Sequence, residues 1–264
     1  MMVMGYMAAA LIGVSLGLTG GGGSILTMPV LVYLFGISPV IAAAYSLFIV
    51  GSSSLVGAAG KIRQQLVSYH AVLYFGVPSL LTVFVTRKWL MPALPEVFFT
   101  LYGFPVTKAA FTLLLFSVLM LMAGVSMIRD QEIAMADDTA RIHPLRIGVQ
   151  GMITGLVTGL VGAGGGFLIV PALMWMLRLP VKTAIGSSLL IIAINSLAGF
   201  VGDVMNYSIE WPLVLPVTGI AIAGIFIGNS LQQHVSAVHL KKGSGWFVLA
   251  MGIYIIIKEL FFKA

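Results

Sequence analysis

The chain contains no cysteine, and only 8% of its 264 residues are charged. Without cysteine there is no disulfide, no thiolate metal site and no mechanism that passes through a cysteine persulfide. The four histidines show no metal-ligand spacing such as HExxH, so we expect neither a metal centre nor a cofactor. Soluble domains carry about 25% charged residues. This chain therefore has too little polar surface to cover a globule in water.

Long apolar runs take the place of that polar surface. Runs such as AFTLLLFSVLMLMAGVSMI approach the roughly 20 residues that a helix needs to cross a bilayer, and no stretch shows the alternation of a membrane barrel. Lys and Arg stand singly or in pairs at the ends of these runs, as in loops between spans, and not as in a nucleic-acid surface. The sequence predicts an all-α polytopic protein, multi-pass in the lipid bilayer of the cell inner (cytoplasmic) membrane. No Lys or Arg precedes the first run, so we expect a retained segment and not a cleaved signal.

The chain is also a duplication with an offset of 142 residues. GVSLGLTGGGGSILTMPVL (13–31) aligns without a gap on GLVTGLVGAGGGFLIVPAL (155–173), and the alignment continues into the following segment. Seven glycines and one proline coincide over the two aligned blocks, which chance pairing of apolar segments does not produce. We therefore expect two transmembrane repeats, 1–128 and 147–264, joined by a charged loop in water at 129–146.

Each half is expected to hold a glycine-broken first segment and three further helices. The expected segments are 2–35, 38–60, 68–86 and 108–128 in the first half, and 147–178, 181–202, 212–232 and 245–262 in the second. Residues 89–106 have three prolines and no counterpart in the second half. We expect them to form an interfacial loop or a short surface helix.

The glycine runs decide how each broken segment sits in the membrane. Non-helical backbone survives in hydrocarbon only where it is buried in protein or lines a cavity, so each run is either a break within one crossing or the tip of a re-entrant hairpin. One crossing would divide Lys and Arg seven to seven between the two sides, whereas a hairpin divides them nine to five. We prefer the hairpin, which leaves an odd number of crossings per half and so predicts inverted repeats. The nine expected cytoplasmic residues are Lys61, Arg63, Arg129, Arg141, Arg146, Arg178, Lys182, Lys241 and Lys242.

A glycine run followed by a restarting helix is suited to binding an anion. The first N–H groups of the helix are exposed there at a partial positive charge, and glycine lets a ligand approach the backbone. We expect Ser24 to be the N-cap of the restarting helix in the first half. The alternative role is close helix packing, which we prefer for Gly13-x3-Gly17 and Gly155-x3-Gly159. The candidate substrate-binding residues of the two runs are Gly20, Gly21, Gly22, Gly23 and Ser24, with Gly162, Gly164, Gly165 and Gly166.

The second helix of each half adds neutral hydrogen-bonding groups. Ser46 and Ser188 are equivalent in the repeat, as are Ser53 and Asn195. With Ser187 they are candidate ligands for the oxygens of an anion, or else they form hydrogen bonds between helices. Charged residues near the ends of these helices are candidates for gating or for attracting anions: Lys61, Arg63, Arg178, Lys182 and Asp203. Lys61 and Asp203 are equivalent and opposite in charge, which predicts either an ion pair or two solvated helix ends.

The motifs GLTGGGGSILTMPVL and GLVTGLVGAGGGFLIVPAL, each followed by a serine-bearing helix, resemble those of the TauE/SafE family of membrane transporters. The resemblance covers nearly the whole chain, including KKGSGWFVLAMGIYIIIKEL near its end. Members of this family are described as sulfite exporters or as carriers of small organosulfonates. The resemblance implies transport of a small sulfur-containing anion and leaves the substrate and the direction open.

The residue patterns favour a secondary transporter that moves a small organic or inorganic anion by alternating access. The resemblance implies sulfite, sulfoacetate or another organosulfonate as that anion. A passive anion channel is the alternative, because it would share the same features without an occluded site. An intramembrane serine hydrolase is disfavoured, because it would need a base near Ser187 or Ser188 and the four histidines lie near expected loops. We expect no nucleic-acid partner, and a homodimer is left open.

Overall fold

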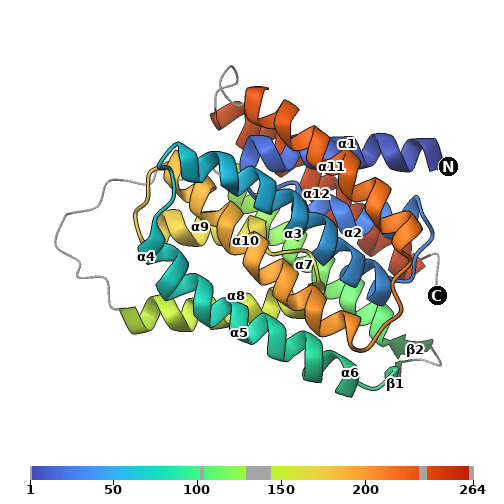
Figure 1. Ribbon diagram of the computed structural model, residues 1–264. Helices are drawn as coiled ribbons and strands as arrows, with labels where there is room; N and C mark the ends of the chain where they lie inside the picture. Colours follow the sequence, from blue (N-terminus) through green and yellow to red (C-terminus); the bar gives the residue numbers. More distant parts are fainter. Residues whose placement is uncertain (1, 102–103, 129–143, 232–236, 262–264) are drawn as a thin grey trace.

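The computed structural model describes residues 2–101, 104–128, 144–231 and 237–261, and these are nearly all helical (Figure 1). Among them, six helices are long and apolar enough to cross a membrane. They are Pro39–Arg63, Tyr69–Ala93, Lys108–Ser126, Pro144–Val161, Val181–Val204 and Trp211–Leu231. The expected class, a helical multi-pass membrane protein, is therefore confirmed.

The helices follow the expected order, with ends that differ by a few residues. The first half has α1 (Met2–Thr19), α2 (Ser24–Tyr33), α3 (Pro39–Arg63), a continuous helical stretch from Tyr69 to Ala93, and α7 (Lys108–Ile128). The second half has α8 (Pro144–Val161), α9 (Gly166–Met176), α10 (Val181–Val204), α11 (Trp211–Leu231) and α12 (Ala237–Phe261). The expected charged loop 129–146 lies outside the described residues up to 143, and α8 already begins at Pro144.

Two π-helical turns interrupt the long helix of the first half. Its parts are α4 (Tyr69–Ala71), η1 (Val72–Gly76), α5 (Val77–Val85), η2 (Thr86–Leu90) and α6 (Met91–Ala93). Pro78 and Pro92 each follow one of the π turns by two residues. Because a proline ring clashes with the carbonyl four residues earlier, a widened turn before it lets the helix continue. The helix thus runs past residue 86, where we expected it to end.

The expectation of an interfacial loop or a short surface helix at 89–106 is wrong, because this segment is the end of a long helix followed by two strands. The helix continues to Ala93, and the chain then makes an antiparallel hairpin of β1 (Val97–Leu101) and β2 (Phe104–Thr107). Phe98 packs against Phe111 at the start of α7, with ring centroids 5.1 Å apart. The strands are too short for an alternation of polar and apolar residues to be visible in the sequence. The prolines also argued against both a continuing helix and a hairpin.

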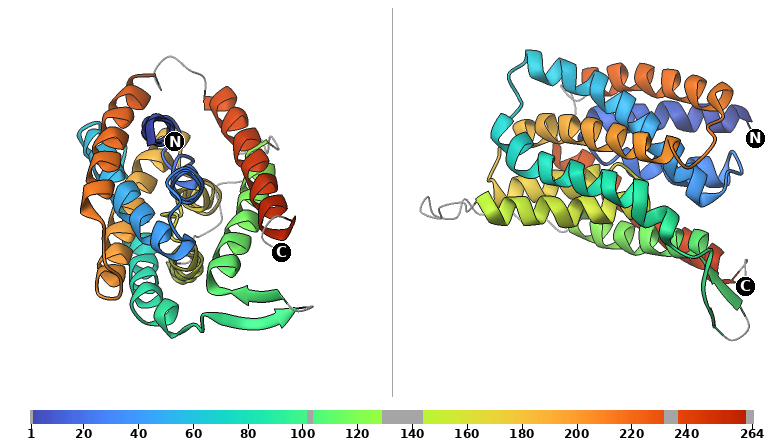
Figure 2. Two further views of the ribbon diagram at one scale, coloured as in Figure 1. Left: turned by 90° about the vertical axis from the view of Figure 1, so that its right-hand side faces the viewer. Right: turned by 60° about the horizontal axis from the view of Figure 1, so that its bottom comes forward.

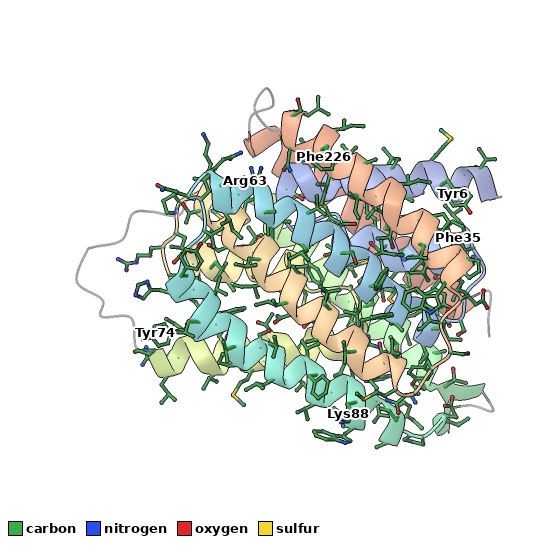
Figure 3. All side chains as sticks on the ribbon, viewed as in Figure 1. Tyr6, Phe35, Arg63, Tyr74, Lys88 and Phe226 are labelled. Atoms are coloured by element: carbon green, nitrogen blue, oxygen red, sulfur yellow. The ribbon has the colours of Figure 1, made fainter. Side chains whose placement is uncertain are left out.

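Each glycine-broken segment forms a helical hairpin. The rings of Tyr6 near the start of α1 and Phe35 after the end of α2 are 5.8 Å apart, so the chain returns to the end at which it began (Figure 3). The α1–α2 hairpin opens toward the end of the molecule that carries the N-terminus, and the α8–α9 hairpin opens toward the opposite end (Figure 1). Inverted halves would give this arrangement, and the inversion itself stays a prediction.

The hairpins form the middle layer of the molecule. Seen end on, α1, α2, α8 and α9 make a central row, with α3, α5, α10 and α11 on one side and α7 and α12 on the other (Figure 2). The apolar core continues through this row, because Ile25 of α2 and Phe167 of α9 belong to one buried cluster with Phe116 of α7 and Val248 of α12. Ala43 of α3, on the other side of the row, belongs to the same cluster, so the start of each second hairpin helix is covered on both sides.

Each hairpin packs against a helix of the other half. α1 lies on α11, where a side chain at Gly13 or Gly17 would overlap the backbone near Ala221 or Ile225. α8 lies on the α5 region, where a side chain at Gly155 would lie 2.9 Å from the Cα of Ser79. The close-packing role of these glycines is confirmed, since any larger residue would separate the helices.

Candidate anion-binding site

The two glycine runs are the tips of the hairpins, and the tips meet inside the protein. A Cβ atom on Gly166 would lie 2.5 Å from the Cα of Gly21, so neither tip has room for a side chain. The whole of 20–25 and of 161–167 is buried. Gly20 and Gly162, at equivalent positions where the chain leaves α1 and α8, have φ values of +69° and +75°, a region that glycine enters at little cost. The structure thus brings the two predicted runs together.

Ser24 is not the N-cap that we expected. Gly23 holds that position, and Ser24 is the first residue of α2, with its hydroxyl donating to the carbonyl oxygen of Gly21 at 2.7 Å. Within the glycine run, the backbone amide of Gly22 donates a hydrogen bond to Thr19 Oγ1 at 3.0 Å. α9 likewise begins after a glycine, Gly165, without a side-chain cap. Both restarting helices therefore begin without a side-chain cap, so no capping side chain takes up the amide groups of their first turns.

Three of the five predicted polar residues on α3 and α10 form hydrogen bonds to other elements. Ser188 Oγ shares its one proton between two carbonyl oxygens, that of Gly20 at 3.0 Å and that of Ile185 at 2.9 Å. Ser187 Oγ accepts a bond from the amide of Ser68 at 2.8 Å. Asn195 Nδ2 donates to Ser79 Oγ at 2.7 Å. These side chains hold the hairpins and neighbouring helices in register, as the alternative role predicted.

The other two predicted residues, Ser46 and Ser53, do not form such hydrogen bonds with described residues. Both are fully buried, and their hydroxyls have no hydrogen-bond partner among the described residues. Ser54 and Ser196, which are equivalent in the repeat and which our candidate set did not include, share this state. A buried hydroxyl without a partner costs about 1–3 kcal/mol. Such groups are therefore candidates for contact with a ligand.

Helix periodicity relates these hydroxyls to the second tip. A side chain at Gly164 would lie 2.7 Å from Val50 of α3, and 2.9 Å from Ser196 Oγ of α10. Ser46, Ser53 and Ser54 are three or four residues from Val50, which places them on the same face of α3. The unpartnered hydroxyls thus lie on the faces of α3 and α10 that adjoin the hairpin tips.

An ion pair that the sequence did not predict lies beside the second tip. Arg87 Nη1 and Asp203 Oδ2 are 3.3 Å apart, and both side chains are wholly buried. Asp203 therefore pairs with Arg87 of η2 and not with Lys61, and it is no solvated helix end, so both readings of Asp203 were wrong. The sequence predicts that Arg87 and Lys88 lie in a loop, because a proline-rich segment follows them. The continuing helix instead carries Arg87 into the interior.

The remaining basic candidates gather at the end of the molecule where the α8–α9 hairpin opens. Arg63 ends α3 at this end (Figure 3), while Arg178 and Lys182 flank the turn between α9 and α10. These three are exposed, whereas Lys61 is buried and feels the positive charge of Lys182. We name Lys61, Arg63, Arg178 and Lys182 the basic mouth. Nothing in the geometry assigns gating to it, and that role stays a prediction.

Comparison with known proteins agrees with this architecture. The family model described as "Sulfite exporter TauE/SafE" matches residues 6–255. A "Probable membrane transporter protein" of Xylella fastidiosa (strain 9a5c) is 30% identical over 255 residues, which cover 94% of this chain and 92% of the relative. A probable membrane transporter protein of Methanocaldococcus jannaschii is 25% identical, with 94% of this chain and 92% of the relative covered. No solved structure matches significantly. The match over nearly the whole chain, together with the multi-pass helical fold, places the protein in the TauE/SafE family of membrane transporters.

Proposed function

We propose that the protein is a secondary transporter for a small sulfur-containing anion, such as sulfite, sulfoacetate or another organosulfonate. The observation that carries the proposal is the meeting of the two glycine tips beside buried hydroxyls that have no hydrogen-bond partner in the described part of the chain. The helix starts at Ser24 and Gly166 supply backbone N–H groups at a partial positive charge. The hydroxyls of Ser46, Ser53, Ser54 and Ser196 supply neutral donors for the oxygens of an anion.

The choice of a sulfur anion rests on the family, because the matching family model is described by sulfite export. The tips have no room even for a methyl group, so the hairpins would have to separate to admit the anion. We place the protein in the cytoplasmic membrane. A homodimer is compatible with this proposal and is not needed by it, since both tips come from one chain.

Alternating access is the mechanism that suits this geometry. The tips are buried on all sides, so the site is closed in the described conformation. The two hairpins open toward opposite ends of the molecule (Figure 1), so that movement of either one would open the site toward a different side. The basic mouth would raise the local concentration of anions at one end.

The experiment is uptake of labelled sulfite, sulfoacetate, methanesulfonate and taurine into proteoliposomes. We expect saturable uptake of at least one sulfur anion, accelerated when the same anion is loaded inside. Gly21→Val and Gly164→Val should abolish it, because the new side chain would separate the tips from each other or from α10. Gly219→Val on α11 is the matched control, since a side chain there meets no atom within 4 Å.

Three outcomes would speak against the proposal. Failure of the folded wild type to take up any of the anions would refute the substrate class. Uptake without acceleration by internal anion would indicate the passive channel. Full activity of both tip variants would move the site away from the glycine runs and reduce these to packing.

A further inference from the structure

The buried pair of Arg87 and Asp203 has an unusual feature. The two side chains are 3.3 Å apart, and apart from this contact none of the guanidinium nitrogens and neither carboxylate oxygen has a hydrogen-bond partner among the residues that the structure describes. Burying two charges is unfavourable unless their remaining donors and acceptors are also satisfied. A pair that serves stability alone would be expected to have those bonds. The remaining donors of Arg87 are therefore available to a ligand.

Three glycines make room for Arg87 and bring it to the second tip. Its stem passes over α10 at Gly199 and Gly202, where a Cβ atom would lie 3.6 Å from Arg87 Cγ and 3.2 Å from Arg87 Cβ. Its terminal nitrogen Nη2 occupies the position at which a side chain on Gly162 would begin. The planar guanidinium presents a fork of donors that matches the oxygens of a sulfonate or sulfite group. Arg87 thus combines full burial, free donors and contact with a glycine tip.

We propose that a monovalent anion binds Arg87 at the second glycine tip in place of Asp203, and that Asp203 takes up one proton as it is displaced. This inference rests on the proposed function and names its coupling ion. In the empty site, the charges of Arg87 and Asp203 sum to zero. In the loaded site, the anion neutralises Arg87, and the displaced carboxylate accepts a proton from solvent and becomes a neutral acid. One anion and one proton then cross together, without net charge movement.

The other charged and titratable groups around the pair do not replace Asp203 as the group that accepts the proton. Lys88 of η2 directs its ammonium over the rings of Phe84 and Trp89, 5.5 and 5.1 Å from their centroids. Glu96 is exposed and pairs with Lys108 at 3.7 Å. The remaining groups here are Tyr207, half-buried after α10, and Tyr45 of α3, whose hydroxyl accepts a bond from the amide of Glu210. Asp203 is the carboxylate that contacts Arg87.

The test uses the full chain in proteoliposomes that enclose a pH indicator, with methanesulfonate as the probe. This anion keeps a single negative charge at every pH used, so any proton movement belongs to the protein. We expect methanesulfonate entry to acidify the lumen with one proton per anion, and an inward proton gradient to drive accumulation. Clamping the membrane potential at different values should leave the rate unchanged, because the transported pair is neutral.

Variants separate proton uptake by Asp203 from anion binding by Arg87. Asp203→Asn should keep exchange of labelled for unlabelled methanesulfonate while losing proton movement, since the amide cannot take up the proton. Arg87→Gln should weaken methanesulfonate binding by about tenfold or more, as expected when a hydrogen bond to a charged group is lost. Lys88→Gln is the matched control and should retain both activities. The double variant Arg87→Gln/Asp203→Asn removes both charges of the pair and leaves neither partner unpaired, so it should remain monodisperse in detergent and transport nothing.

The possible results distinguish this inference from the proposed function. Uptake of methanesulfonate without proton movement, or with a rate that follows the membrane potential, would overturn the inference and leave the transporter intact. Undiminished transport by the double variant would also overturn it, and this result decides the question if a single variant fails to fold. A preference for the dianion sulfoacetate would contradict the single neutralised charge. Failure of the wild type to carry any anion would refute both proposals.

Discussion

The hydroxyl of Ser188 donates a hydrogen bond of 3.0 Å to the carbonyl oxygen of Gly20, which joins the middle of α10 to the tip of the first hairpin. Both residues are buried, and 168 positions separate them in the chain. The bond fixes a glycine in left-handed conformation at the point where α1 ends. Long-range polar contacts of this kind hold the hairpin tips in the closed arrangement.

Ser188→Ala should loosen the first tip. The loss of one buried hydrogen bond is expected to cost about 1 kcal/mol of the free energy of unfolding and to reduce anion exchange, because the carbonyl of Gly20 would lose this donor. Thermal unfolding in detergent and counterflow in proteoliposomes would measure the two effects. Ser126→Ala on an exposed part of α7 is the control. An unchanged melting temperature and unchanged exchange would show that the tip is held by packing alone.

Ser54→Ala should impair transport without lowering the stability of the protein. The hydroxyl is buried without a partner in the described structure, so its removal should leave the empty protein as stable as before, or more stable by up to about 1 kcal/mol. Transport should show a higher KM for the anion, since a ligand donor is gone. Thr112→Ala is the contrast, because the Thr112 hydroxyl donates to the carbonyl of Lys108 at 2.9 Å and its loss should destabilise. A destabilised Ser54→Ala protein with unchanged KM would contradict a ligand role.

Gly13→Val should disrupt the packing of α1 on α11. A side chain at Gly13 would overlap the carbonyl group of Ala221, and backbone atoms cannot move aside as flexible side chains do. We expect a lower melting temperature and poor recovery of monodisperse protein. Gly60→Val on α3, where a side chain meets no atom within 4 Å, should have a small effect. Equal stability of the two variants would show that α1 and α11 are not tightly packed in the membrane.

Neutralising the exposed residues of the basic mouth should slow the capture of anions. The triple variant Arg63→Gln, Arg178→Gln and Lys182→Gln removes three positive charges from one end of the molecule. We expect kcat/KM to fall several-fold at low ionic strength and the difference to shrink near 0.15 M salt, where charges are screened beyond about 8 Å. Initial rates at several salt concentrations would test this. A salt-independent loss would indicate a structural role instead.

The helices and their order were readable from the sequence, because the length of an apolar run and the position of a glycine break are local properties. The hairpin tips were readable for the same reason, since two aligned runs of glycine are far longer than helix packing needs. The helical course through Pro78 and Pro92 was harder to foresee. Proline usually ends a helix, and the π turns that accommodate it depend on the surrounding packing.

The pairing of charges and hydroxyls was decided by the tertiary structure. Lys61 and Asp203 are equivalent in the repeat, yet Asp203 contacts Arg87, because η2 lies beside the end of α10 and Gly199 and Gly202 leave space for the arginine stem. Ser188 and Ser46 are also equivalent, yet only Ser188 finds a partner in the described structure, Gly20 of the other half. Sequence by itself determined the membrane class, the broken helices and the family. Which polar groups are satisfied, and which remain free for a ligand, depends on contacts between helices far apart in the chain, and only the folded arrangement sets those contacts.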